Sequence, residues 1–385
     1  MKQGWEIKKL GEVCEIIGGS TPKTNEPSYW DGEHYWVTPA ELDGAKYISS
    51  TKRTITDAGV KNAHLQLLPK GSVLLSSRAP IGKVAITTVP MYCNQGFKNL
   101  VCSDKLYNEF AYWFLYHNTD YLNSLGTGAT FKEISKRVVE QIPISIPPRA
   151  EQERIVAELD CLSGVIEKKK QQLKELDALA QSIFYQMFGD PITNEKGWEV
   201  KKLGEVAYIG LGFTHTPEYV EDGVAFLSVK DISSGEICWD NIKYVSQQEY
   251  DSAPKGAKPN KGDIMFCRVG TMGKPVIVDT DIPFCTFVSL GYLHILDEDI
   301  LNIYVKYWMQ SYAFDVQVEE NVKGVAIKNL NTGWLKTFNI QHPPISLQQE
   351  FADKIEAIEK QKELIKKSIS ETETLFNARM DYYFN

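Results

Sequence analysis

Two groups of basic, hydroxyl and amide side chains, one in each half of the chain, lie in glycine-rich stretches that are typical of surface loops. Lys and Arg in such loops neutralise phosphate groups, and Arg, Asn and Gln form paired hydrogen bonds with the edges of guanine and adenine. A solvated surface charge is the alternative interpretation for any single member. The predicted nucleic-acid contacts are Lys23, Thr24, Thr38, Arg78, Lys83, Asn94, Gln95, Lys98 and Lys132 in the first half and Thr214, His215, Lys230, Arg268, Lys274, Lys323 and Lys328 in the second.

Arg78 and Arg268 differ from the rest of this set in their sequence setting. Each follows an apolar run with strand character and precedes a Gly-Lys pair, so we expect the two arginines to occupy corresponding positions in the two halves. An Arg in an apolar setting needs a hydrogen-bonding or charged partner. DNA is the partner that we predict for both.

The chain carries none of the common catalytic motifs. No glycine-rich loop is followed by Lys and Ser or Thr, which excludes a P-loop, and no HExxH pattern is present. The Pro-Pro pairs at 147–148 and 343–344 are followed by Arg149 and Ile345, so the tetrapeptide of amino-methyltransferases is absent. The seven cysteines form no CxxC pair and have no His at metal-ligand spacing. We therefore expect a chain that is non-catalytic by itself and binds neither a metal nor a cofactor.

Charge and composition restrict the class of protein. The 385 residues are 43% hydrophobic and carry a net charge of −8, which argues against binding nucleic acid through overall charge. Residues 1–150 contain 17 Lys and Arg against 14 Asp and Glu, whereas residues 190–346 contain 14 against 21. Any DNA contact must therefore come from local patches. The charged first residues are followed by no long apolar run, so we expect a cytoplasmic protein without a membrane span.

The sequence contains an internal repeat. Residues 4–13 recur as residues 197–206 with nine of ten identical, and each half closes with Ile-x-x-Pro-Pro, at 144–148 and 340–344. Between these phrases the match is looser but keeps its order. Short β-rich runs at 72–75, 83–88, 263–266 and 275–278 and helical segments at 106–125 and 303–317 give each half a mixed α and β character.

A long helix with an apolar heptad stripe follows each half. Steps of four and three residues from Ile155 to Met187 meet apolar side chains except at Lys169. The same steps from Phe351 to Tyr383 meet apolar side chains except at Lys362, Thr372 and Arg379. A stripe that repeats every 3.5 residues over more than four heptads predicts a coiled coil, with the two lysines as candidates for fixing its register. The predicted seam comprises Ile155, Leu159, Leu162, Leu173, Leu176, Ile183, Phe351, Ile355, Ile358, Ile365, Ile369 and Phe376.

These elements define an α+β fold class. We predict two mixed α/β recognition domains joined by two long helices, which form an antiparallel coiled coil and give a pseudo-twofold, cyclic arrangement. The predicted boundaries are 1–150 for the first domain, 151–189 for the first helix, 190–346 for the second domain and 347–385 for the second helix.

The order and duplication of these phrases resemble the specificity (S) subunit of a type I restriction-modification system. The resemblance covers nearly the whole chain. It rests on the repeated opening phrase, on Gly128 to Lys132 and Gly324 to Lys328, on the helix entry Pro147-Pro148-x-x-Glu-Gln-Glu-Arg-Ile and on the helix exit Phe184-x-x-Met-Phe-Gly-Asp. The second helix departs from the pattern at its entry, where residues 347–351 read Leu-Gln-Gln-Glu-Phe, which we interpret as drift.

The resemblance implies a function and a set of partners. Each recognition domain would read one half of a bipartite, asymmetric site in double-stranded DNA, and the helices would set the spacing and dock two methyltransferase (M) subunits. Those partners would bind S-adenosylmethionine and methylate adenine N6. Restriction (R) subunits would add ATP-driven translocation and Mg-dependent cleavage. The chain itself would have no contact with a membrane.

Two other functions stay open from the sequence alone. A self-sufficient nuclease or methyltransferase would need a catalytic motif, and assays with S-adenosylmethionine or Mg²⁺ would detect it. A coiled-coil scaffold or adaptor that binds proteins or sugars is favoured slightly by the acidic second half. A salt-dependent gel shift on duplex DNA separates that scaffold from a DNA-binding subunit.

Overall fold

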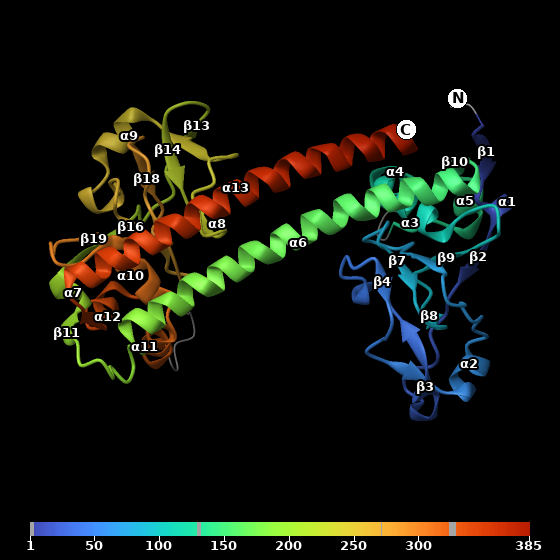
Figure 1. Cartoon of the computed structure of the whole chain (residues 1–385), viewed down its shortest axis with the longest axis horizontal. Coiled ribbons are helices and arrows are strands. Elements are labelled where there is room, and N and C mark those ends of the chain that lie inside the picture. The colour runs from blue at the N-terminus through green and yellow to red at the C-terminus, as the bar shows by residue number, and fades with distance from the viewer. Residues whose placement is uncertain (1–3, 129–131, 271, 323–328) are drawn as a thin grey trace. The chain divides into compact units, whose positions relative to one another are not determined.

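The computed structural model describes residues 4–128, 132–270, 272–322 and 329–385 (Figure 1). The chain divides into two compact units. Unit 1 consists of Met1–Lys170 together with Lys367–Asn385, and unit 2 consists of Gln171–Lys366. Unit 1 therefore combines the first part of the chain with its last residues, as the predicted cyclic order requires.

Unit 1 is a mixed α and β domain. Its order is β1 (Glu6–Lys9), α1 (Leu10–Val13), β2 (Cys14–Gly18), η1 (Pro27–Tyr29), β3 (Trp30–Val37), η2 (Pro39–Glu41), β4 (Tyr47–Ile48), β5 (Thr54–Ile55), α2 (Asp57–Asn62), β6 (Val73–Leu75), β7 (Val84–Thr87), β8 (Tyr92–Cys93), β9 (Lys98–Cys102), α3 (Asn108–His117), α4 (Thr119–Ser124), α5 (Lys136–Gln141) and β10 (Pro143–Ile146). The first long helix, α6 (Arg149–Phe188), begins directly after this domain.

Unit 2 repeats this order with small changes. It contains β11 (Glu199–Lys202), α7 (Leu203–Val206), β12 (Ala207–Leu211), β13 (Tyr219–Val220), β14 (Val224–Leu227), α8 (Val229–Ile232), β15 (Lys243–Val245), α9 (Gln247–Ser252), η3 (Lys255–Ala257), β16 (Ile264–Cys267), β17 (Gly273–Ile277), β18 (Phe284–Thr286), β19 (Leu290–Ile295), α10 (Asn302–Met309), α11 (Tyr312–Val322), α12 (Thr332–Leu335) and β20 (Asn339–His342). The second long helix is α13 (Ile345–Phe384).

The sheets of the two units share most of their strand order, with β4 added in unit 1 and β13 added in unit 2. Unit 1 has sheets in the orders β2-β9-β6-β7-β4 and β5-β3-β8, and unit 2 has β12-β19-β16-β17 and β13-β15-β14-β18. The parallel pair of β3 with β8 in unit 1 matches the parallel pair of β14 with β18 in unit 2, and unit 1 has a second parallel pair, β4 with β7. The internal repeat in the sequence is therefore a repeat in topology.

The opening and closing phrases of the repeat form a two-stranded sheet in each domain, which we call the base strand pair. The opening phrase forms β1 and the closing phrase forms β10, and the two strands pair antiparallel, as do β11 and β20 in unit 2. Leu10 and Leu203, which follow the opening strands, are fully buried. A strand pair with a buried anchor immediately before each long helix explains why these phrases match between the halves.

The two long helices run antiparallel in each unit. In unit 1 the Arg154 guanidinium donates to Tyr383 Oη at 3.2 Å, so the beginning of α6 lies beside the end of α13 (Figure 1). In unit 2 the ring centroids of Phe184 and Phe351 are 5.9 Å apart, so the end of α6 lies beside the beginning of α13. The predicted antiparallel pairing of the helices is confirmed.

Burial along the predicted seam is greatest near the recognition domains. Seven seam residues are buried and five are half-buried. The buried residues are Ile155, Leu159, Phe351, Ile355, Ile358, Ile369 and Phe376, and the half-buried ones are Leu162, Leu173, Leu176, Ile183 and Ile365. All twelve therefore face the packed side of the helices rather than solvent.

The two seam lysines bind polar groups on the opposite helix. Lys169 Nζ donates to Ser368 Oγ and to Thr372 Oγ1, while Lys362 Nζ lies 2.7 Å from Asp177 Oδ1. Each lysine thus has a partner that a shift of one helix turn would remove. Their role in fixing the register stays a prediction.

The described ranges contain no helix that is both long and apolar enough to cross a membrane.

Candidate nucleic-acid interface and its joints with the long helices

The predicted contacts of unit 1 gather where β3, β6, β8 and β9 meet. Ser77 N–H donates to Gly96 O at 2.7 Å, and Asn94 N–H donates to Val37 O at 3.1 Å. Thr21 Oγ1 donates to Gln95 Oε1, which ties the loop carrying Lys23 and Thr24 to the same place. Both Lys23 and Thr24 are exposed. These contacts bring segments from several parts of the sequence together.

Arg78 and Lys98 share one carboxylate in this region. Arg78 Nε lies 2.9 Å from Glu133 Oε2, and Lys98 Nζ lies 3.2 Å from Glu133 Oε1. Burial pushes the pKa of the Glu133 carboxyl up, but the hydrogen bonds from Arg78 and Lys98 outweigh it, so this pKa lies below its ordinary value. The Arg78 side chain stays 46% exposed. Glu133 therefore orients a guanidinium that still has free donors, beside the exposed Lys132.

Three other predicted contacts of unit 1 use their polar groups to shape the loops. Thr38 Oγ1 donates to Glu41 Oε2 at 2.9 Å, and Asn94 Oδ1 accepts from Gly96 N–H at 2.8 Å. Lys83 Nζ donates to Leu42 O at 2.9 Å. Because these groups already have partners within the domain, we expect them to hold the loops in place rather than to contact bases.

The predicted contacts of unit 2 are more dispersed. Thr214, His215 and Lys230 are exposed. His215 Nε2 lies 3.0 Å from Glu249 Oε1, and Lys274 Nζ donates to Ser233 O at 2.9 Å. Lys323 and Lys328 lie outside the described residues.

Arg268 does not correspond to Arg78, so the predicted pairing of the two arginines is wrong. Leu330 N–H donates to Arg268 O in unit 2, and the same contact in unit 1 is Ile134 N–H to Ser77 O. Arg268 is therefore equivalent to Ser77, and Arg78 to Val269. A displacement of one residue along a strand turns the side chain to the other face.

The buried position of Arg268 gives it a structural role. The side chain is 7% exposed, and burial lowers the pKa of its guanidinium from the ordinary value. Its Nε donates to Leu330 O at 2.9 Å and its Nη1 donates to Val288 O at 2.8 Å. The guanidinium thus binds two backbone carbonyls inside unit 2, which is the partner that an Arg in an apolar setting requires.

One buried glutamine in each unit connects the recognition domain to the long helix that follows it. In unit 1, Gln152 Oε1 accepts from Tyr107 N–H at 2.7 Å, and its Nε2 donates to Lys105 O and to Pro147 O, both at 3.0 Å. Gln152 is 1% exposed. One side chain of α6 therefore holds both the loop before α3 and the Pro-Pro turn.

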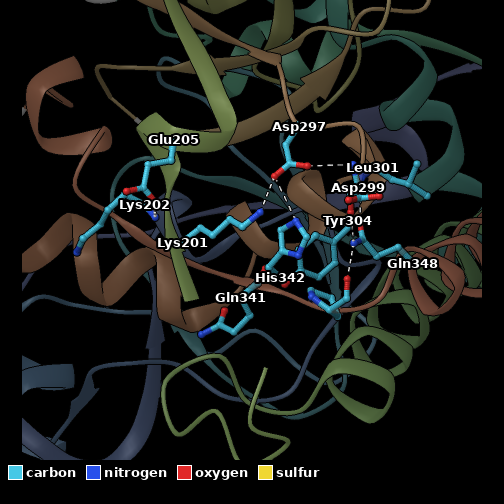
Figure 2. A network of polar contacts seen from close by, with 11 residues as sticks. Lys201, Lys202, Glu205, Asp297, Asp299, Leu301, Tyr304, Gln341, His342 and Gln348 are labelled. Carbon is cyan, nitrogen blue, oxygen red and sulfur yellow. Dashed lines mark hydrogen bonds and ion pairs between the residues drawn. The ribbon is translucent and has the colours of Figure 1, made fainter. Parts of the chain in front are cut away.

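Gln348 repeats these three contacts in unit 2. Its Oε1 accepts from Leu301 N–H at 2.8 Å, and its Nε2 donates to Asp299 O at 2.9 Å and to Pro343 O at 2.8 Å. Figure 2 shows Gln348 meeting the loop that carries Asp299 and Leu301. The side chain is fully buried. We call Gln152 and Gln348 the joint glutamines.

Sequence reasoning missed the joint glutamines, although the repeat contained them. Drift is the interpretation that the sequence favours for the second helix entry, where four of the five residues differ from those of the first. Gln348 is the residue that stays the same, 196 positions after Gln152. The identity of Gln152 and Gln348 within otherwise different helix entries is the sequence feature that points to the joint.

An ion-paired aspartate reinforces the joint of unit 2. Asp297 Oδ2 lies 2.9 Å from Lys201 Nζ of β11 and 3.2 Å from His342 Nε2 of β20 (Figure 2). The hydrogen bond from Lys201 lowers the pKa of the Asp297 carboxyl below its ordinary value. Asp297 thus links the base strand pair to the loop that Gln348 holds.

Replacing Asp297 by Asn should weaken unit 2 in a pH-dependent way. We expect a loss of about 1–2 kcal/mol in the free energy of unfolding at pH 7, because a charge-assisted hydrogen bond is lost. The folded pKa is lowered, so this stabilisation is present above about pH 4 and disappears as pH falls through the folded pKa. Denaturant unfolding of both proteins at neutral and acidic pH measures it. A difference that is the same at pH 3 and pH 7 would contradict the ion pair.

Lys46 connects the domain of unit 1 to its helix in a different way. Its Nζ lies 2.9 Å from Glu109 Oε2 of α3 and 2.5 Å from Asp160 Oδ1 of α6. Trp113 Nε1 donates to the same Asp160 oxygen at 2.9 Å. Lys46, Trp113 and Asp160 line a groove of about 900 Å³ beside the helices of unit 1. The domain is therefore fixed to α6 by an ion pair as well as by Gln152.

No group of three His, Cys, Asp or Glu side chains in the described part of the chain is placed to hold a metal ion. The arrangement consists of oriented cations on loops and rigid joints behind them. Cations held in this way can neutralise the phosphates of a polyanion.

Comparison with known proteins agrees with this arrangement. The sequence profile of the type I restriction modification DNA specificity domain matches twice, at residues 2–178 and 195–374. The MjaIX specificity subunit of Methanocaldococcus jannaschii, a type I restriction enzyme subunit, is 32% identical over 372 residues, which span 90% of this chain and 85% of that protein. The EcoBI specificity subunit of Escherichia coli is 23% identical over 309 residues, 73% of this chain and 65% of that one.

Solved structures show the same fold. A crystal structure of a type I restriction-modification S subunit from M. genitalium has a TM-score of 0.56 at 15% identity, covering 99% of this chain and 96% of that one. A chain from a structure described as explaining complex assembly and conformational transition of the type I R-M system has a TM-score of 0.61 at 19% identity, covering 100% and 98%.

The chain is thus built from two DNA-specificity domains, each followed by a long helix. It belongs to the family of type I restriction-modification specificity subunits.

Proposed function

We propose that this protein is the sequence-specific DNA-recognition subunit of a type I restriction-modification complex, with each unit reading one half of a bipartite, asymmetric site. The observation that carries the proposal is the duplication of one DNA-specificity domain, with cations on its loops, inside a single chain. A coiled-coil scaffold unrelated to DNA is not favoured, because both repeats match a DNA specificity domain.

The two units present different side chains at equivalent positions. Arg78, Lys98 and Glu133 of unit 1 form the ion-paired cluster described above. By strand register and shared backbone contacts, the corresponding residues of unit 2 are Val269, Gly291 and Asn329. Two domains with unlike contact residues read unlike half-sites, which supports an asymmetric target.

Arg78→Ala should relax reading of one half-site only. A bidentate Arg contact to a base contributes about 1–3 kcal/mol of discrimination, equivalent to roughly 5-fold to 150-fold in relative affinity. The measurement is binding to duplex libraries randomised in one half-site at a time, with the methyltransferase partner present. Val269→Ala, the equivalent position of unit 2, is the matched control and should change neither half. An equal loss on all DNA sequences would instead make Arg78 a phosphate contact or a folding residue.

The long helices would serve as a spacer between the two readers. Each helix contains 40 residues, which corresponds to a length of about 60 Å at 1.5 Å per residue. Because duplex DNA repeats its groove about every 10 base pairs, readers on a rigid spacer meet their half-sites only at matched separations. This supports a fixed gap in the recognised site.

The helices also offer equivalent surfaces for two methyltransferase subunits. Leu179 and Leu375, 196 positions apart, are each 48% exposed. A groove of about 900 Å³ in unit 1 and one of about 480 Å³ in unit 2 lie beside the helix pair at equivalent positions. Duplicated exposed leucines on a charged helix fit a partner that binds twice.

The double variant Leu179→Glu with Leu375→Glu should therefore weaken methyltransferase binding by at least about tenfold, since a buried apolar contact would be replaced by a charge. Folding should be unaffected because both side chains are exposed. Analytical ultracentrifugation of the mixed subunits measures the assembly. Leu364→Glu is the control: this leucine is 70% exposed but corresponds to Lys168, so it has no duplicate. Equal binding by the double variant and the parent chain would reject this docking surface.

Catalysis in the proposed complex belongs to the partner subunits. Methyltransferase subunits would supply S-adenosylmethionine and modify adenine N6, and restriction subunits would supply ATP-driven translocation and Mg-dependent cleavage. The lack of catalytic motifs in the sequence supports this division of labour. The present chain contributes the choice of DNA.

A further inference from the structure

Two cysteines of unit 1 face each other across a strand pair. Cys14 of β2 and Cys102 of β9 are register partners in an antiparallel ladder. The thiol of Cys14 donates to the Cys102 sulfur, with 3.6 Å between the two sulfur atoms. Both cysteines are free thiols in this structure.

The register at this position suits a covalent link. Ser103 N–H donates to Val13 O at 2.9 Å, so the neighbouring pair carries the hydrogen bond and the cysteines form a non-hydrogen-bonded pair. Cα atoms of such pairs lie about 4.5 Å apart, at the short end of the range that disulfides accept. The sulfur atoms need only approach each other to reach bonding distance.

The two thiols also differ in their access to solvent. Cys14 is 7% exposed, whereas Cys102 is half-buried and open to a small oxidant. The hydrogen bond to Cys102, together with burial, raises the pKa of the Cys14 thiol. Because Cys102 is the more accessible of the two, its sulfur is the one positioned to be oxidised first.

We propose that Cys14 and Cys102 form a redox modification site, at which a peroxide-class oxidant converts the two thiols into a disulfide. The Cys102 thiolate attacks one oxygen of hydrogen peroxide, the O–O bond breaks, and sulfenic acid and hydroxide form. The Cys14 sulfur then attacks the sulfenic sulfur, and the S–S bond forms as hydroxide leaves. The two hydroxide ions take up the protons of the two thiols and form two water molecules. A dithiol reductant reverses the reaction by thiol exchange.

The disulfide would close a ring around the reading domain of unit 1. The two cysteines are 88 residues apart, and strands β2 to β9 all lie between them. The link also adjoins Lys105 and Tyr107, which Gln152 binds. Oxidation would therefore restrain unit 1 alone, since Ala207 and Ile295 occupy the same register in unit 2. This inference concerns unit 1 itself and does not depend on the proposed DNA target.

The test treats the full-length chain with hydrogen peroxide, blocks the remaining thiols and maps the peptides by mass spectrometry. We expect a Cys14–Cys102 cross-linked peptide and a rise in the melting temperature of unit 1 of roughly 10 °C, both reversed by dithiothreitol. Cys14→Ala, which copies Ala207 of unit 2, and Cys102→Ser should each abolish both effects. Installing Cys at Ala207 and Ile295 should transfer the link to unit 2. Oxidation confined to the exposed Cys161 and Cys238, or a cross-link without any change in melting, would overturn the proposal.

Discussion

Inserting one heptad after Lys170 in α6 and one before Lys367 in α13 should lengthen the gap in the recognised DNA site and leave both half-sites unchanged. These positions are the borders of units 1 and 2, so each unit keeps its own residues. Seven residues add about 10 Å of helix, close to the length of three base pairs. A heptad also preserves the seam, because the apolar stripe repeats every seven residues.

The measurement for the heptad insertion is a map of methylated adenines in a host that carries the variant with its methyltransferase. We expect modified sites whose gap is longer by one to about three base pairs, with the parental half-site sequences. A heptad in α6 alone is the control and should abolish recognition, since it shifts one side of the seam against the other. Full methylation at the parental spacing by the double insertion would show that the helices do not measure the gap.

Gln348→Leu should destabilise unit 2 by about 2–4 kcal/mol. The substitution fills the same space but leaves the Leu301 N–H and the carbonyls of Asp299 and Pro343 without their buried partner. Each unsatisfied buried group costs roughly 1–3 kcal/mol, and partial relaxation of the loop recovers part of the sum. Denaturant unfolding of the full chain measures the loss.

Gln349 provides the matched control for Gln348. It is the next residue on α13 and is exposed, and its side chain donates to Asp353 at 3.1 Å within the same helix. Gln349→Leu should change stability by less than about 0.5 kcal/mol. Gln152→Leu should repeat the effect in unit 1. If Gln348→Leu and Gln349→Leu behaved alike, the joint glutamines would not fix the helices to the domains.

The sequence was sufficient for the architecture because its evidence is periodic and repeated. The heptad stripe from Ile155 and its echo from Phe351 are long enough to define two helices, and the internal repeat supplies each helix with a partner. Nine identities in ten residues locate the start of each domain. The structure adds the reason: these phrases form β1 and β11, whose partners β10 and β20 lead into the long helices.

The candidate site was less accessible to sequence reasoning, as Arg268 illustrates. Its neighbours read like those of Arg78, but the two residues differ by one position in strand register and so point to opposite faces. Type and spacing alone do not resolve a displacement of one residue in a divergent loop. The same limit applies to Thr38, Lys83 and Asn94, whose polar groups turn out to bind within the domain.

The joint glutamines show the opposite case, a functional position that looked unremarkable. A single Gln on a charged helix resembles its solvated neighbours, and only its recurrence 196 positions later distinguishes it. Two of its three buried contacts in each unit reach a loop that lies 45 and 47 residues away in unit 1 and 47 and 49 residues away in unit 2. Only the tertiary fold brings these groups together.

The most direct test of the central claim is selection of bound duplexes from a random library by the protein in complex with its methyltransferase subunits. Two unlike half-sites at one fixed spacing are the predicted result, and exchanging the recognition domain of unit 1 should replace one half-site only. Selection of a single contiguous motif, or of no motif, would contradict the account of two readers on one spacer.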